Sequence, residues 1–204
     1  VGWNLGGISA IQRCRANFAT EGENAQDSNP RYTTSDRLCI DGKKLVVGSS
    51  ASVANDVAYW ATGTEYKTEL DGFAKIVAYG SSPNGGHGYF KVWTKDGRVL
   101  IYGAEEDSQN SKIYAPNQLS GPISTWALDK VEDAYGNTYT VTYERDTPNG
   151  EYYPSQIDLG STGLVEFTYQ SRNGQTPWGY DGGHKFQQTK VLDKVTTYIG
   201  TTKA

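Results

Sequence analysis

Alternating apolar and polar residues in the second half of the chain constrain its fold most strongly. Residues 138–144, TYTVTYE, place two tyrosines and a valine on one side of an extended chain and threonines with a glutamate on the other. Residues 165–170, VEFTYQ, repeat this pattern. A period of two is typical of strands that bury one face. Residues 125–170 are therefore expected to form a meander that supplies scaffold and no chemistry.

Turn dipeptides separate short apolar runs along most of the chain. Asp-Gly, Gly-Asn and Asn-Gly favour tight hairpin turns because these residues tolerate positive φ. They occupy positions 41–42, 71–72, 96–97, 136–137 and 149–150. Hairpins are predicted accordingly over residues 37–48, 65–80 and 89–103. The fold class that follows is all-β, built from antiparallel hairpins and a meander.

The composition agrees with the all-β class and argues against several functions. The 204 residues include 15 Tyr, 5 Trp, 5 Phe and 24 Gly, and they suffice for a hydrophobic core. The 19 basic and 23 acidic residues give a net charge of −4 and are scattered along the chain. Nucleic acid is therefore not an expected partner, because phosphate binding needs a concentrated basic face. No apolar run approaches the roughly 18 residues of a membrane-spanning helix.

The domain organisation is predicted from a polar, irregular stretch before residue 122. Residues 1–122 are predicted to form a hairpin region and residues 123–204 a meander region, and the alternative is one continuous domain. Residues 171–188 are predicted to be a long loop, followed by a last strand over 190–199. The chain starts at Val1 without a methionine. It is therefore expected to be a piece of a longer protein, with any targeting signal upstream.

The two cysteines, Cys14 and Cys39, are 25 positions apart. In a secreted protein a bridge between them would contribute on the order of 3 kcal/mol. Two separate buried thiols explain the same residues equally well. The sequence leaves both alternatives open.

No constellation of catalytic or metal-binding residues is evident. The two histidines, His87 and His184, lie in Gly-rich loops without metal-binding spacing, so water-exposed side chains are expected. Neighbouring acids such as Glu65 and Glu69, or Glu132 and Asp133, are candidates for glycoside hydrolysis, which needs two carboxyls about 5 to 9 Å apart, but the sequence does not show that distance. No catalytic residue, cofactor or metal ligand is predicted. A weaker hypothesis is an enzyme that brings both histidines into one cleft with a carboxylate.

The aromatic pair Trp178 and Tyr180 is the candidate for ligand stacking. Flat aromatic rings suit sugar ligands. The favoured interpretation is that both rings pack beneath their own loop and pin it, as aromatic residues of long loops commonly do. The alternative is a carbohydrate-binding or cell-surface-binding module.

Several long motifs resemble one protein family. They are GWNLGGISAIQRC, SDRLCIDGKKLV, GTEYKTELDGFAKIVAYG, FKVWTKDGRVLIYG and WALDKVEDAYGNTYTVTYERDTPNGEYYPSQIDL. Together they cover most of residues 2–170. They are similar to the region shared by the Salmonella virulence plasmid B protein, the B subunits of Tc-type insecticidal toxins, and large RHS-repeat proteins.

The resemblance implies a section of a β-shell in a very large secreted protein. Such shells enclose a C-terminal toxic polypeptide until delivery, so the implied partners are the remainder of the parent protein and its toxic cargo. The ADP-ribosyltransferase of some members and the self-cleaving aspartate core of RHS proteins are absent from this sequence. The implied role is therefore structural, non-catalytic and extracellular. A section of a shell is also expected to carry open strand edges and an uncovered apolar face.

Overall fold

The computed structural model describes residues 6–15, 29–48, 56–70, 72–82, 86–104, 106, 110–116, 118, 121–174, 176–200 and 202–203. Within these residues the structure is almost entirely β. The strands in chain order are β1 (Ala10–Cys14), β2 (Arg37–Ile40), β3 (Lys43–Val47), β4 (Glu65–Thr68), β5 (Lys75–Tyr79), β6 (Tyr89–Trp93), β7 (Val99–Tyr102), β8 (Lys112–Tyr114), β9 (Ile123–Glu132), β10 (Thr138–Asp146), β11 (Glu151–Asp158), β12 (Gly163–Ser171), β13 (Trp178–Asp181), β14 (His184–Gln187), β15 (Lys190–Ile199) and β16 (Thr202–Lys203). Short helices are α2 (Asp56–Tyr59), η2 (Thr147–Asn149) and η3 (Gly160–Thr162).

No helix in the described part of the chain has the length and apolar character needed to cross a bilayer. The predicted all-β antiparallel class is confirmed, because every pair of neighbouring strands runs antiparallel. The one α-helix in the described ranges, α2, occupies four residues of the connection between β3 and β4.

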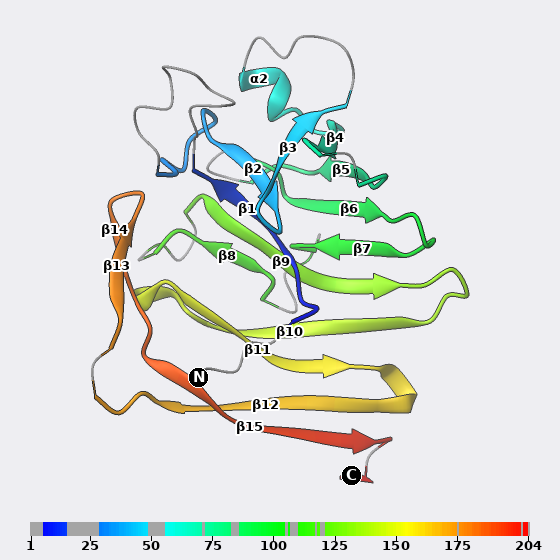
Figure 1. Cartoon of the computed structure of the whole chain (residues 1–204), viewed down its shortest axis with the longest axis vertical. Coiled ribbons are helices and arrows are strands. Elements are labelled where there is room, and N and C mark those ends of the chain that lie inside the picture. Colours follow the sequence, from blue (N-terminus) through cyan, green and yellow to red (C-terminus); the bar gives the residue numbers. More distant parts are fainter. Residues whose placement is uncertain are drawn as a thin grey trace.

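Apart from β13 and β14, which pair only with each other, the strands form one sheet that closes on itself. Its order runs from β1 through β7 to β9, and β9 also pairs with β1, with Ile11 opposite Trp126. The strands β1 to β7 together with β9 thus make a ring. From β9 the sheet continues through β10, β11, β12 and β15 to β16. Figure 1 shows β6, β7, β9, β10, β11, β12 and β15 lying one below another, with β1 and β2 in front of the upper ones.

The predicted hairpins are confirmed, and backbone geometry explains their turns. The β2–β3 turn has Asp41 at φ 49° and Gly42 at φ 77°, the positive values that a two-residue turn requires. Positive φ also occurs at Gly97, between β6 and β7, and at Gly136, between β9 and β10. Local sequence therefore determines which neighbouring strands pair.

The hydrophobic core fills the ring and is rich in aromatic residues. Trp126, Tyr66, Phe90 and Tyr102 are at most 1% exposed. Their rings pack edge to face, as between Phe90 and Trp126 with centroids 5.2 Å apart. In β10, Val141 and Tyr143 are buried while Glu144 is exposed, as the alternating pattern predicts.

Strand β9 connects the ring to the open sheet. Its first half pairs with β1 and β8, and its second half pairs with β7 and β10. The predicted division after residue 122 falls immediately before this strand, and β9 pairs with strands on both sides of that division. The stretch before it, expected to be irregular, contains the short strand β8.

Residues 171–188 differ from the predicted long loop, because they contain the hairpin β13–β14. Figure 1 shows this hairpin standing across the ends of the sheet strands. It contacts the ring through its turn, where a Cβ atom at Gly182 would overlap the Pro30 carbonyl and the Tyr32 ring. The hairpin is therefore held by contact with the segment before β2. The local sequence pattern does not indicate this contact.

The Gly182 contact supports a matched test. Gly182→Ala is expected to lower the free energy of unfolding by about 2–3 kcal/mol, because it adds a steric overlap to the strain of a positive φ. Gly183→Ala in the same turn should cost about 1 kcal/mol, since Gly183 also has positive φ but has open space around it. Urea unfolding measures both. Equal losses would show that the contact with Tyr32 contributes nothing.

Candidate functional site

His87 is fully buried, and the prediction of an exposed loop histidine is wrong for this residue. Its imidazole lies among aromatic rings, stacked on Trp60 and edge-on to Phe90, each with centroids 5.2 Å away. The chain folds this way because β6, which follows His87 directly, carries Phe90 into the ring interior. The Gly-rich sequence around His87 does not indicate this packing.

Hydrogen bonds assign the protonation state of His87. The Tyr66 hydroxyl donates to the Tyr59 carbonyl, so Nε2–H of His87 donates to the Tyr66 oxygen at 2.7 Å. Nδ1 of His87 is buried and has no hydrogen-bond partner among the residues that the structure describes. Burial lowers the pKa of His87 to about 4, and the nearby Arg13 charge acts in the same direction. His87 is therefore a neutral core residue with no access for a substrate.

His184 lies apart from this cluster in the contacts it makes. It is half-buried in β14 and meets the Tyr32 ring at 5.7 Å, whereas His87 contacts Trp60, Tyr66 and Phe90. No contact joins the two histidines among the described residues. Across that same part of the chain, no group of three His, Cys, Asp or Glu residues is placed to hold a metal ion. The hypothesis of one cleft with both histidines gains no support.

The carboxylates considered above for glycoside hydrolysis include three that form ion pairs or hydrogen bonds at the surface. Glu65 pairs with Lys75 at 3.2 Å, and Glu132 pairs with Lys130 at 3.4 Å. Asp133 accepts hydrogen bonds from two backbone N–H groups of its own turn. These partners explain the carboxylates as strand-surface and turn residues.

Trp178 and Tyr180 are 62% and 59% exposed, so the prediction that they pin their loop from beneath is wrong. They point to one face of β13 with ring centroids 5.9 Å apart, and the Lys185 ammonium lies 5.8 Å from the Trp178 ring. Phe186, on the opposite face of the hairpin, packs near Gly150 instead. Alternation within β13–β14 explains why the pinning residue is Phe186.

Cys14 and Cys39 are joined by a disulfide in the structure, with Cα atoms 5.7 Å apart. The bond connects β1 to its neighbour β2, where Cys39 lies opposite Gln12. The chain between the two cysteines includes residues 29–36, and these residues contribute to the network of polar contacts described next.

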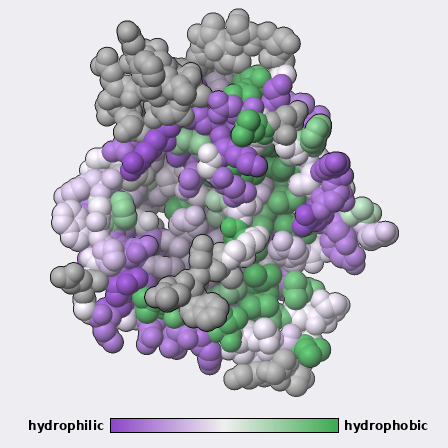
Figure 2. Space-filling view, in the orientation of Figure 1, coloured by the Kyte–Doolittle hydropathy of each residue, from purple (hydrophilic) through white to green (hydrophobic). Residues whose placement is uncertain are grey.

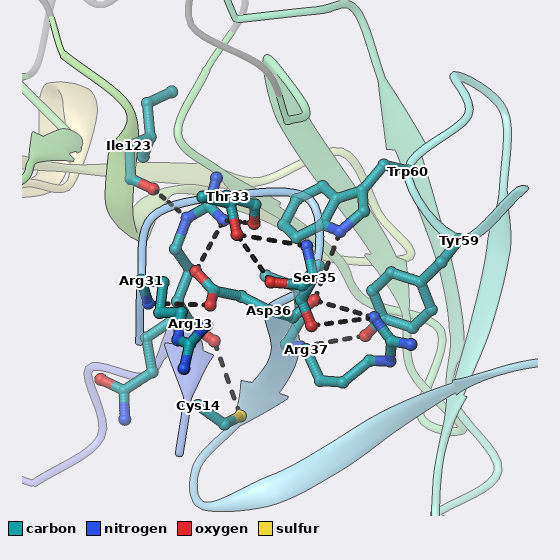
Figure 3. A network of polar contacts seen from close by, with 12 residues as sticks. Arg13, Cys14, Arg31, Thr33, Ser35, Asp36, Arg37, Tyr59, Trp60 and Ile123 are labelled. Carbon is teal, nitrogen blue, oxygen red and sulfur yellow. Dashed lines mark hydrogen bonds and ion pairs between the residues drawn. The ribbon is translucent and has the colours of Figure 1, made fainter. Parts of the chain in front are cut away.

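A buried ion pair organises this end of the ring (Figure 3). Arg13 and Asp36 approach to 3.0 Å with side chains 2% and 5% exposed. Arg13 also donates to the carbonyls of Ile123 at 2.8 Å and Thr33 at 2.6 Å. Its guanidinium lies 4.6 Å from the Trp60 ring centroid. One cation therefore joins β1 to β9, to the segment before β2, and to the residue after α2.

Asp36 completes the network from the other side. Its second carboxylate oxygen accepts the Arg31 backbone N–H at 2.9 Å, and its carbonyl accepts the Trp60 indole N–H at 3.3 Å. Burial lowers the pKa of Arg13, and the Asp36 carboxylate opposes this effect. The pair serves structure, because its hydrogen-bonding groups are directed at backbone atoms of the ring.

An apolar face runs out of the ring and becomes exposed along the open sheet. Cross-strand partners share a face, which places Val141, Ile157 and Val165 in one row and Phe167 beside Val195 in the next. Exposure rises from 0% at Val141 to 7% at Phe167 and 48% at Val195. Figure 2 shows apolar residues gathered over the lower strands. The face that forms the core inside the ring is thus uncovered at β15.

The edge of β15 is open as well. On one side β15 pairs with β12 along nine positions, from Gly163 opposite Ile199 to Ser171 opposite Lys190. On its other side, within the described residues, only Tyr198 and Ile199 pair, with β16. Residues 190–197 therefore present unpaired backbone groups beside an apolar face. A further strand would pair with these backbone groups and extend the sheet beyond β15.

Comparison with known proteins agrees with this architecture. The family model of the Salmonella virulence plasmid 65kDa B protein, SpvB, matches residues 1–161. Among solved structures, the N-terminal domain of the effector SpvB from Salmonella typhimurium superposes with a TM-score of 0.69 and 16% identity, covering 98% of this chain and 77% of that chain. No curated protein sequence matches the chain significantly.

Tc toxin structures share the same fold. The TcdB2-TccC3 crystal structure gives a TM-score of 0.69 at 16% identity, and the Photorhabdus luminescens Tc holotoxin pore gives 0.66 at 16% identity. These matches cover 98% and 94% of this chain but only 12% and 11% of the toxin chains. The chain thus spans a small part of those proteins.

A closed ring that continues into an open sheet with one apolar face is the all-β fold that this chain shares with these structures. The chain belongs to the SpvB family, since the family model covers most of its length.

Proposed function

We propose that this chain is a non-catalytic structural section of a large secreted toxin, in which a β-shell encloses and delivers a C-terminal toxic polypeptide. The observation that carries the proposal is the apolar face that becomes exposed from Phe167 to Val195 beside the open edge of β15. Exposed edges with apolar faces promote association, so folded proteins cover them. Here the cover is the next part of the same shell.

The comparisons support a larger parent protein. The fold matches 98% of this chain within TcdB2-TccC3, of which it covers only 12%. The remainder of the parent and its toxic cargo are the partners in this proposal. Secretion is supported by the Cys14–Cys39 disulfide, because such bonds persist in oxidising compartments.

The absence of catalysis is supported by what the polar residues do. His87 is enclosed by rings, the Arg13–Asp36 pair binds backbone carbonyls and N–H groups, and Glu65 is held in a surface ion pair. Each of these residues has a structural role that accounts for its surroundings.

The proposal is tested by Val195→Asp in the complete protein. A carboxylate placed in a covered apolar face costs several kcal/mol, so the shell should open at β15 and proteolysis of the C-terminal polypeptide should accelerate at least about tenfold. Lys194→Asn is the control, because it makes the same change in charge on the opposite face of β15. Equal, unchanged cleavage in both variants would contradict a covered face at Val195.

A further inference from the structure

A pocket of about 530 Å³ lies on the outer face of the ring, opposite the core. Register places its floor in one cross-strand row, in which Gln12 lies opposite Cys39 on one side and Thr125 on the other. Lys44 and Ile113 extend the row at its two ends. Cys39, Thr125 and Lys44 are at most 8% exposed although they face outward, whereas Gln12 in the same row is exposed. Other segments therefore cover the row on both sides of Gln12.

The cover consists of aromatic residues from separate segments. Tyr32 comes from the segment before β2, Tyr152 from β11, and Tyr180 and Phe186 from the β13–β14 hairpin. The hairpin is held in place by the contact of its turn with Tyr32. The pocket is thus a built cavity with a strand floor and aromatic walls, and its size is within the range of small-ligand sites.

The lining offers hydrogen bonds and positive charge. The side chains of Gln12, Thr125 and Arg15 make no hydrogen bond or ion pair with any residue that the structure describes. Arg15 is exposed, and Lys44 also lines the pocket. None of the lining residues that the structure describes is acidic. Amide, hydroxyl and guanidinium groups next to aromatic walls suit a ligand with a ring, several hydroxyls and a carboxylate.

A peptide fits these features less well. Extended peptides are commonly bound by pairing with a free strand edge. In the floor, β1 lies between β2 and β9, and β2 lies between β1 and β3, so both edges of β1 and β2 are occupied. Only the short strand β8, at the end of the row, pairs on a single side among the described residues. Along β1 and β2, recognition in this pocket must therefore come from side chains.

We propose that the pocket binds the carboxylate-bearing sugar of an acidic glycan. The ring of the sugar packs on the aromatic wall formed by Tyr152 and Phe186, its hydroxyls bond to Gln12 and Thr125, and its carboxylate binds Arg15. Of the exposed pair on the hairpin, Tyr180 also lines the pocket, whereas Trp178 does not. The inference does not depend on the shell role, because it concerns the outer face of the ring.

The test is a ligand-observed NMR titration of the complete protein with methyl glycosides of N-acetylneuraminic acid and glucuronic acid. Neutral methyl glucoside serves as the comparison and should bind at least about tenfold more weakly than the better acidic sugar. Arg15→Gln should weaken acidic-sugar binding by about tenfold or more, because a charge-assisted hydrogen bond is lost. Arg98→Gln removes the same charge at an exposed site outside the pocket lining and should leave binding unchanged.

Each outcome decides the proposal. Loss of binding in Arg15→Gln, with normal binding in Arg98→Gln and Trp178→Ala, supports the pocket. Loss in Trp178→Ala alone would transfer the ligand to the exposed hairpin face and overturn the proposal. It would likewise be overturned by equal binding of acidic and neutral sugars, by no binding at millimolar sugar, or by binding of an Asp/Glu-rich peptide but no sugar.

Discussion

Replacing Arg13 with methionine is expected to lower the free energy of unfolding by about 3–5 kcal/mol, the usual cost of removing one partner from a buried ion pair. The substitution leaves the Asp36 carboxylate 5% exposed without its cation. It also leaves the carbonyls of Ile123 and Thr33 without their donor. The loss should be large because these contacts join β1, β9 and the segment before β2.

A surface ion pair in the same chain provides the control. Arg98 and Asp96 approach to 2.6 Å with side chains 51% and 54% exposed. Arg98→Met should therefore cost less than about 1 kcal/mol. Urea unfolding at pH 7 measures both variants. Similar losses for Arg13→Met and Arg98→Met would show that the buried network does not organise this end of the ring.

Acidification is expected to destabilise the protein through His87. Its pKa falls from the ordinary 6.5 to about 4 in the folded state. A lowered histidine pKa means that its full contribution to stability is present above pH 6.5 and is lost as pH falls towards 4, because the unfolded chain takes up the proton first. The limit is about 3 kcal/mol, at 1.36 kcal/mol for each pH unit. Protonated His87 would carry a second N–H at Nδ1, for which the described part of the chain provides no acceptor.

Substitutions at the two histidines distinguish the effect of His87 from the titration of all other groups. His87→Gln should lower stability at pH 7 but reduce the decline between pH 6.5 and 4 by about 3 kcal/mol. His184→Gln, at the half-buried position in β14, should retain the decline of the unmodified protein. Unfolding free energies measured across this pH range provide the comparison. A decline that is the same in both variants would contradict the assignment to His87.

Local patterns were sufficient to predict the hairpins and the strand faces. Asp41-Gly42 has the positive φ angles that its turn requires, and Val141 lies inward as the alternation in β10 indicates. These features depend on a few neighbouring residues, so single-sequence reasoning reaches them. The strand over residues 190–199 follows from the same reasoning and is confirmed as β15.

Contacts between distant segments were beyond that reasoning. The ring closes where Ile11 pairs with Trp126, and nothing near either residue specifies that register. His87 was expected in water because its loop is rich in glycine, yet the rings that enclose it come from other segments, such as Trp60 after α2. Burial of a loop residue depends on what packs against it.

The candidate sites also divide into one feature that was expected and one that was not. An uncovered apolar face was expected from the family resemblance, and the exposure of Val195 and Ile199 provides it. The outer pocket was not foreseen, because Gln12, Thr125 and Phe186 meet only through strand register and hairpin contact. A basic residue such as Arg15 in a polar segment carries no signal of its own.

Enclosure is the central claim, and limited proteolysis of the complete, unmodified protein tests it most directly. The lifetime of the C-terminal polypeptide is followed by mass spectrometry in the native protein and after the shell has been unfolded. A shell that includes this section predicts that the polypeptide survives in the native protein long after the unfolded sample is digested. Cleavage at the same rate in both samples would contradict a role in enclosing cargo.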